Sequence, residues 1–293
     1  MKTALVIDLN YMGDMLMSSP VYRALSEQGY EVDAMIWPEG KEALRGNPYV
    51  RKIFQVDNMF TEFVTAWSDC HMSHYDLALH LSTSRWCSFL VWLTGAKLRL
   101  AYSYLNNAWP WCNIRIPKET RCFQSQYRVD EVCNLLWEGL KIHVNNRKMI
   151  FESTSEVPFS LKEFEKPYIG FHVNPARTRG QRWWNSWAWL GDFLIREHKV
   201  GTIFFTGVAE DTPYIESIIN QMGYKNQAVN VSGLTSLSEL AALIKKCSLF
   251  CSVNSGPMHL AISQGVPTFG IIGATPARVV FPVNDPKHSY IEI

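Results

Sequence analysis

Short apolar runs of strand-forming residues alternate with amphipathic stretches, and this alternation limits the fold more than any other feature. The first apolar run covers residues 3–9, and an amphipathic stretch follows at 15–27. Because a strand–helix–strand unit joins parallel strands through a covering helix, the pattern predicts a parallel α/β sheet with helices on both faces. Further strands are expected at 29–37, 52–56, 75–81, 97–101, 168–173, 201–206, 228–231, 249–253 and 268–272, and helices at 85–94, 127–140, 186–198, 211–222, 237–246 and 257–264.

The chain length and two interruptions of the alternation predict two domains. The 293 residues, 47% of them hydrophobic, are enough for about two domains of about 150 residues. Residues 102–126 are rich in Asn, Trp and Pro and are expected to form a loop, and the polar stretch 152–166 is expected to link the domains. We therefore predict Rossmann-like domains at 1–155 and 156–293, facing across a cleft lined by the loops that follow the strands.

Composition and charge lower the rank of several classes of protein. Lys plus Arg number 28 and Asp plus Glu 27, so the net charge of +1 is lower than is usual for a nucleic-acid-binding protein. Asp8 and Asp14 interrupt any apolar signal region, and no apolar run approaches the roughly 18 residues of a membrane span. The seven cysteines are scattered without a Cys-x-x-Cys pair, which favours reduced, buried thiols. We expect a cytoplasmic protein without a metal site.

The loop after the first strand, Asn10-Tyr-Met-Gly-Asp14, is a candidate catalytic element. Gly13 allows a sharp turn close to a ligand. Asp14 falls at the start of the next helix, where an aspartate often serves only as a cap. The same carboxylate could also accept a proton from an attacking hydroxyl group at the cleft.

Two loops of the second domain carry candidate phosphate- or ribose-binding residues. Residues 174–185 contain three arginines and no acid, which suits either a diphosphate or a solvated basic loop. In the loop that begins at Thr206 and Gly207, the acid Glu210 either complements a helix dipole or holds ribose hydroxyl groups.

A third loop of the second domain, Asn254-Ser-Gly-Pro257, precedes a predicted helix. Unpaired backbone N–H groups at a helix start favour a diphosphate. His259 either adds a donor there or simply packs.

These residues resemble a known family. Ser252-Val-Asn-Ser-Gly-Pro-Met-His-Leu260, followed by Gly265-Val-Pro267 and Gly273-Ala-Thr-Pro276, is similar to the C-terminal signature of glycosyltransferase family 9, the ADP-heptose:lipopolysaccharide heptosyltransferases. The loop that ends at Asp14 resembles the Met-Gly-Asp loop of that family. Arg182-Trp183 and Tyr127-Arg-Val-Asp130 resemble two further, less specific motifs of the family.

The resemblance implies a GT-B fold and an inverting, metal-independent glycosyltransferase without a cofactor. The implied reaction moves heptose from ADP-heptose to a lipopolysaccharide core or related glycan, with Asp14 as the catalytic base. The acceptor-binding residues indicated in the first domain are Asn10, Met12, Gly13, Tyr127 and Arg128. The donor-binding residues indicated in the second domain are Arg179, Arg182, Thr206, Gly207, Glu210, Asn254, Ser255, Gly256, Pro257, Met258 and His259.

The chain departs from the family pattern at three places. Asn254 stands where the family usually has Asp, and Gln181 stands where it often has Lys. The chain also ends soon after Pro276, so we expect a shortened C-terminal domain. Two other functions stay open from the sequence: a sugar-nucleotide epimerase of GT-B-like fold, and a catalytically silent nucleotide-sugar-binding protein.

A basic segment marks the expected acceptor side. Residues 95–128 hold six cations and one acid, a net charge of +5, together with Trp109 and Trp111. Cations attract anionic headgroups and Trp favours membrane interfaces, so peripheral contact with anionic glycolipid at the inner membrane surface is one interpretation. A solvated loop with its Trp side chains packed inward is the other.

Overall fold

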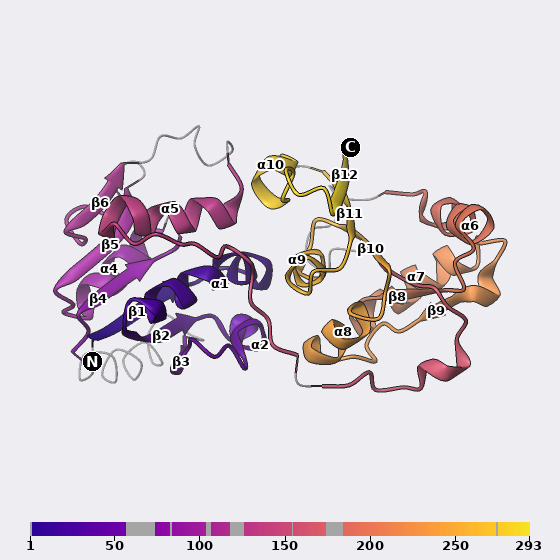
Figure 1. The fold of residues 1–293 in the computed structure, drawn as a ribbon, viewed down its shortest axis with the longest axis horizontal. Helices are drawn as coiled ribbons and strands as arrows, with labels where there is room; N and C mark the ends of the chain where they lie inside the picture. Colours follow the sequence, from indigo (N-terminus) through magenta and orange to yellow (C-terminus); the bar gives the residue numbers. More distant parts are fainter. Residues whose placement is uncertain are drawn as a thin grey trace. The chain divides into compact units, whose positions relative to one another are not determined.

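The chain folds into two compact α/β units (Figure 1). The computed structural model describes residues 2–56, 74–82, 84–103, 107–117, 126–153, 155–173, 184–273 and 275–293. Unit 1 covers Met1–Phe151 and unit 2 covers Glu152–Ile293. The predicted α/β class is confirmed, since each unit contains a six-stranded sheet in which every neighbouring pair of strands is parallel.

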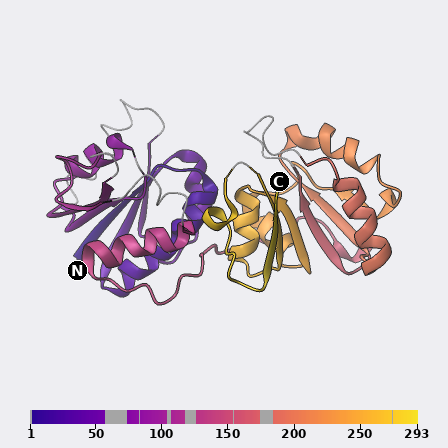
Figure 2. The same ribbon diagram turned by 90° about the horizontal axis from the view of Figure 1, so that it is seen from above.

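The sheet of unit 1 has the strand order β3-β2-β1-β4-β5-β6. Its strands are β1 (Lys2–Asp8), β2 (Tyr30–Ile36), β3 (Lys52–Gln55), β4 (Leu77–His80), β5 (Leu98–Ser103) and β6 (Ile114–Pro117). Its described helices are α1 (Met12–Glu27), α2 (Lys41–Leu44), α4 (Arg85–Leu93) and α5 (Arg128–Leu140), with the 3-10 turn η1 (Pro38–Gly40). Helices α1 and α5 pack together, and α4 covers the opposite face of the sheet (Figure 2).

The sheet of unit 2 has the order β12-β11-β10-β7-β8-β9. Its strands are β7 (Tyr168–His172), β8 (Thr202–Thr206), β9 (Ala228–Asn230), β10 (Leu249–Val253), β11 (Thr268–Ile272) and β12 (His288–Glu292). Its described helices are α6 (Trp187–His198), α7 (Thr212–Ile219), α8 (Leu237–Ile244), α9 (Gly256–Ser263) and α10 (Ala277–Val280), with the 3-10 turns η3 (Leu161–Glu163), η4 (Ala209–Asp211) and η5 (Lys225–Gln227).

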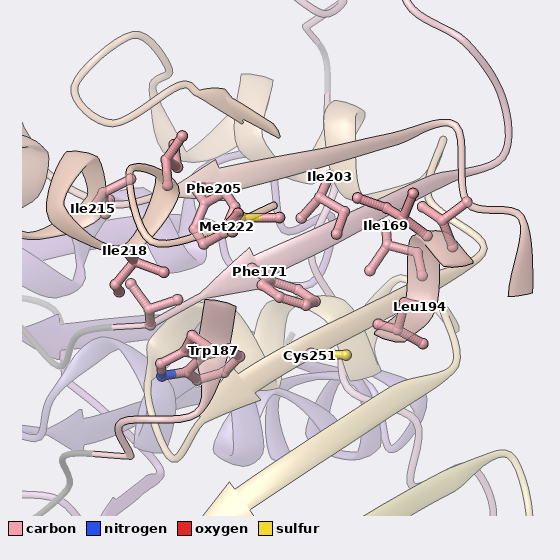
Figure 3. Close-up of a cluster of buried hydrophobic side chains, with 14 of the residues drawn as sticks. Ile169, Phe171, Trp187, Leu194, Ile203, Phe205, Ile215, Ile218, Met222 and Cys251 are labelled. Carbon is pink, nitrogen blue, oxygen red and sulfur yellow. The ribbon is translucent and has the colours of Figure 1, made fainter. Parts of the chain in front are cut away.

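In β7 and β8 of unit 2, successive side chains point to opposite faces of the sheet. One face is apolar, and the other carries a polar side chain at the carboxyl end of each strand. Phe171 of β7 and Phe205 of β8 point to the same side as α6 and α7 (Figure 3). Trp187 of α6 is fully buried there, with its ring centroid 5.2 Å from that of Phe171. Because successive side chains alternate, His172 and Thr206 point to the other face. Packing of Phe171 and Phe205 against the helices therefore places His172 and Thr206, the last residues of β7 and β8, on the opposite face of the sheet.

The two units repeat one strand order. Read from the opposite edge, the second sheet is β9-β8-β7-β10-β11-β12, the same connectivity as in the first. In such sheets the strand order reverses next to the first strand, and ligands bind beyond the carboxyl ends at that point. The expected binding edges are thus the ends of β1 and β4 in unit 1 and of β7 and β10 in unit 2.

Some details differ from the sequence prediction. The loop predicted at 102–126 is wrong in part, since β5 extends to Ser103 and β6 occupies Ile114–Pro117. Strand β6 lies at the sheet edge and is half-exposed, so it lacks the apolar run of a central strand. Strand β12 is a second edge strand that was not predicted, and its side chains are mostly exposed.

Helix α1 begins at Met12 rather than at the predicted residue 15. Met12, Gly13 and Asp14 therefore form its first turn. Tyr11 is the N-cap residue and makes no side-chain capping bond. The glycine lies inside the helix start and not in a turn before it.

The cysteine prediction is confirmed where the structure describes the residues. Buried free thiols are found at Cys87, Cys112, Cys133, Cys247 and Cys251, and the remaining two lie outside the described part of the chain. Within the described ranges, no helix is both long and apolar enough to cross a bilayer.

Candidate active site

Asp14 is a half-buried carboxyl group on the first turn of α1. Within the described residues it accepts no hydrogen bond, so its interaction with the helix start is limited to that of an acid with the helix dipole. Burial raises its pKa above the ordinary value of 3.8, the Arg128 guanidinium opposes that rise, and the Glu131 carboxylate adds to it. A raised pKa makes a carboxylate a better proton acceptor near neutral pH.

Asp8, at the end of β1, was not among the predicted site residues. It is fully buried and accepts a hydrogen bond of 2.5 Å from the Asn10 amide. Its other oxygen has no partner among the described residues, and neither has the buried hydroxyl of Tyr22 on α1. Burial raises the pKa of Asp8, and the Asp14 charge adds to that rise.

Arg128 ties the start of α5 to the end of β4. Its side chain is 13% exposed and donates to a Glu131 carboxylate oxygen at 2.6 Å. It also donates to the backbone carbonyl of Leu81, directly after β4. Its charge lowers the pKa of both Asp8 and Asp14. We call Asp8, Asp14, Arg128 and Glu131 the acidic cluster.

The structure thus brings several predicted acceptor-side residues to one edge of unit 1. Asn10 donates to Asp8 and Arg128 donates to Glu131, and Met12 and Gly13 share the first helical turn with the base candidate. Tyr127 is the N-cap residue of α5. In the part of the chain that the structure describes, no three His, Cys, Asp or Glu side chains form a group that could hold a metal ion.

In unit 2, helix α9 begins directly after β10. Ser255 is its extended N-cap, without a side-chain capping bond, and Gly256 and Pro257 open its first turn. The Ser255 hydroxyl lies 3.1 Å from that of Ser252. A helix start carries a positive partial charge. In α9, Pro257 has no N–H and the Met258 N–H donates to the Ser255 carbonyl at 3.2 Å, so the N–H of Gly256 is the first one available to a ligand. This helix start can therefore receive an anionic diphosphate.

His259 and Met258 follow on α9 and are both buried. Burial lowers the pKa of His259 to about 4, so its ring is neutral at pH 7. Its Nδ1 atom has no partner among the described residues. His259 can thus offer a neutral ring nitrogen but no charge. The Met258 side chain packs against Ile272 and Phe281 in the core.

A row of polar side chains crosses three adjacent strands beneath this helix start. Strand register places Thr206, His172 and Ser252 side by side on β8, β7 and β10. The Thr206 hydroxyl donates to the Phe171 carbonyl at 3.1 Å, so it can accept from His172 Nδ1, also at 3.1 Å. Neither His172 nor Ser252 was among the predicted site residues. We call Thr206, His172 and Ser252 the polar row.

The remaining predicted donor residues lie around the polar row or outside the described chain. Gly207 follows β8, and a Cβ there would lie 2.8 Å from an Asp211 carboxylate oxygen, so a larger residue would require the Asp211 side chain to shift. Glu210 is exposed on η4, and Asn254 is buried after β10. Arg179 and Arg182, with the rest of 174–183, lie outside the described residues.

A cavity of about 980 Å³ lies elsewhere in unit 2. It is lined by residues between 153 and 168 and by the end of α8, including Tyr168 at the first position of β7. It is thus at the amino ends of the strands, and none of the predicted site residues lines it.

Comparisons with known proteins agree with this arrangement. The sequence model of glycosyltransferase family 9 (heptosyltransferase) matches residues 67–291, more than half of the chain. Lipooligosaccharide heptosyltransferase 2 of Haemophilus influenzae is 26% identical over 308 aligned positions, covering 96% of this chain and 86% of the relative.

Two solved structures share the fold. The family 9 glycosyl transferase from Veillonella parvula superimposes with a TM-score of 0.82 at 20% identity, covering 100% of this chain and 86% of that one. ADP-heptose lps heptosyltransferase II of Escherichia coli gives 0.81 at 20% identity, with 99% and 90% covered. The family match covers most of the chain, and the two parallel sheets agree with it. The chain therefore belongs to glycosyltransferase family 9, the heptosyltransferase family, and is a glycosyltransferase.

Proposed function

We propose that this enzyme transfers heptose from ADP-heptose to a lipopolysaccharide core or related glycan acceptor, with inversion and without a metal ion. Asp14 carries the proposal. It is a half-buried carboxyl group with a raised pKa and no hydrogen-bond partner among the described residues. The names of the relatives support the donor and acceptor, since the Escherichia coli structure is described as an ADP-heptose lps heptosyltransferase.

In the proposed step, Asp14 takes the proton of the acceptor hydroxyl group. The acceptor oxygen attacks the anomeric carbon from the side opposite the diphosphate. The bond from that carbon to the diphosphate oxygen breaks, and its electron pair leaves with the diphosphate. Attack from the opposite side inverts the anomeric configuration. The raised pKa of Asp14 suits this role, because a stronger base removes a hydroxyl proton more readily.

The leaving diphosphate needs fixed hydrogen-bond donors where its charge develops. The Gly256 N–H group at the start of α9 is the proposed backbone donor, because Pro257 has no N–H and the Met258 N–H already donates to the Ser255 carbonyl at 3.2 Å. The neutral His259 ring and the Ser255 hydroxyl complete this side of the site. We assign further phosphate contacts to Arg179 and Arg182.

The nucleoside is proposed to bind at the loop that follows β8. Gly207 keeps that loop compact, and the exposed carboxylate of Glu210 is available for ribose hydroxyl groups. Thr206 is proposed to support this loop and not to bind the nucleoside directly, because its hydroxyl already bonds to His172 and to the Phe171 carbonyl. Asn254 stands where the family usually has Asp, so its neutral amide replaces a carboxylate beside the donor.

The acceptor is proposed to bind on unit 1, near Asn10, the first turn of α1 and the start of α5. Tyr127 and Arg128 open that helix beside the base. The acceptor is proposed to be a glycolipid, and the reaction is assigned to the cytoplasm.

The function is tested with purified protein, ADP-heptose and a lipopolysaccharide core acceptor that lacks the heptose. The expected result is ADP release that requires the acceptor, with an acceptor mass increased by one heptose. UDP- and GDP-sugars serve as donor controls and should give no product. Epimer formation without the acceptor, or donor binding without turnover, would contradict the proposal.

A further inference from the structure

Helix α4 has an unusual outward face. A surface helix normally turns polar side chains toward water. Here Cys87 and Leu90 face the core of unit 1, and the half-buried Trp86 packs against the edge of that core. Phe89 and Trp92 follow at three-residue intervals, with Phe89 half-buried and Trp92 exposed. Trp92 is 45% exposed. The helix therefore presents aromatic surface to solvent where charged residues are the norm.

These rings form a continuous ladder that extends beyond the helix. Ring centroids are 5.5 Å apart for Trp86 and Phe89 and 5.7 Å apart for Phe89 and Trp92. Trp111 joins the ladder at 5.0 Å from Phe89 and 5.4 Å from Trp92. Trp109, two residues earlier, is 58% exposed. We call these five residues the aromatic surface.

The sequence stretch that carries the aromatic surface is basic. Residues 77–117 contain no Asp or Glu. Arg99 is held beside the rings, because its Nε atom donates to the Trp111 carbonyl at 2.9 Å. Arg85 and Arg115 are exposed and form no ion pair with another described residue. Among the described cations of this stretch, only Lys97 forms an ion pair, with the Asp76 carboxylate at 3.2 Å.

We propose that the aromatic surface and its cations dock unit 1 onto an anionic lipid bilayer. Tryptophan rings favour the interface between headgroups and acyl chains, and cations are drawn to anionic headgroups. A second copy of this chain fits less well, since two such surfaces would bring like charges together. The inference rests on the proposed function to the extent that a lipid-linked acceptor keeps the enzyme at a membrane.

Sedimentation with lipid vesicles tests the docking surface without any sugar acceptor. We expect the protein to sediment with phosphatidylcholine vesicles that contain about 30% phosphatidylglycerol, and not with phosphatidylcholine alone. Binding should fall about tenfold or more when ionic strength rises from about 0.1 M to about 1 M, because the Debye length shrinks from about 10 Å to about 3 Å. No binding to anionic vesicles at the lower salt would overturn the proposal.

Two double variants assign the binding to this surface. Trp92→Ser with Trp109→Ser should weaken vesicle binding about tenfold or more. Its control is Trp189→Ser, which removes a ring that is 63% exposed on α6 of unit 2 and should leave binding unchanged. Arg85→Gln with Arg115→Gln should also weaken binding about tenfold or more, since each cation near an anionic membrane adds to the attraction.

Unfolding temperatures equal to that of the wild type establish that the variants are folded. Transfer to a water-soluble, delipidated acceptor should be unchanged in the Trp92→Ser/Trp109→Ser variant, which separates docking from chemistry. Wild-type binding by that variant would overturn the proposal. The proposal would also be overturned if the wild type were a dimer in solution and the same variant a monomer, because the surface would then be an interface between copies of the chain.

Discussion

At the edge of unit 1 where β1 and β4 end, three carboxyl groups of the acidic cluster surround one cation, Arg128. At the corresponding edge of unit 2, the polar row lies below the start of α9. The strand order is the same in both units. The first edge favours proton transfer, and the second favours an anion. One backbone arrangement thus supports two kinds of chemistry through a few side chains beyond the strands.

The largest change in unit 2 is expected from Gly256→Pro. Proline is accepted at the first turn of a helix but has no N–H group. We expect kcat to fall about 10²-fold or more, because a donor to the leaving diphosphate is lost. ADP binding, measured by calorimetry, should weaken about tenfold. Gly256→Ala keeps the N–H group and is the matched control. Equal kinetics for the two variants would show that the diphosphate does not bind at this helix start.

In unit 1, Arg128→Gln should change the pH dependence of transfer. The Arg128 charge lowers the pKa of Asp14, so its removal raises that pKa. A base must be deprotonated to act, and the acid limb of the kcat profile should therefore move to higher pH. Arg147→Gln, which breaks an ion pair of 2.6 Å with Asp130 elsewhere on α5, is the control. An acid limb that stays in place, or moves to lower pH, would show that the Arg128 charge does not lower the pKa of the catalytic base.

A smaller effect is expected for Asp8→Asn, measured as the unfolding temperature against pH. Burial raises the folded-state pKa of Asp8 above its ordinary value of 3.8. Protonated Asp8 therefore contributes fully to the free energy of unfolding of the wild type below pH 3.8, its ordinary pKa. That contribution is lost as pH rises through the folded-state pKa. The variant should be more stable than the wild type at neutral pH, and the difference should vanish at acid pH. A less stable variant at neutral pH would show that the buried charge is well compensated.

The sequence predicted the central strands because both faces of a parallel sheet are covered. Strands such as β7 and β10 are buried throughout or nearly so, and they appear as short apolar runs. Edge strands escape this signal. In β6, Ile114 and Ile116 alternate with the exposed Arg115, a pattern too short to distinguish from a loop.

The candidate site was predictable where its residues lie in loops and not where they lie in strands. Gly13 and Asp14 stand out at the start of α1 because a glycine and an acid follow an apolar run. Asp8 and His172 are strand residues, and their place at the binding edge depends on alternation and register with neighbouring strands. A small clue was present, since each is a polar residue at the end of an otherwise largely apolar strand.

The assignment of the base to unit 1 and of the diphosphate to unit 2 is tested most directly by Asp14→Asn, with transfer and ADP binding measured on the same preparation. The account predicts that kcat falls about 10²-fold to 10⁴-fold, the usual contribution of a general base, while the affinity for ADP stays at the wild-type value. Transfer near the wild-type rate, or ADP binding lost together with transfer, would contradict it.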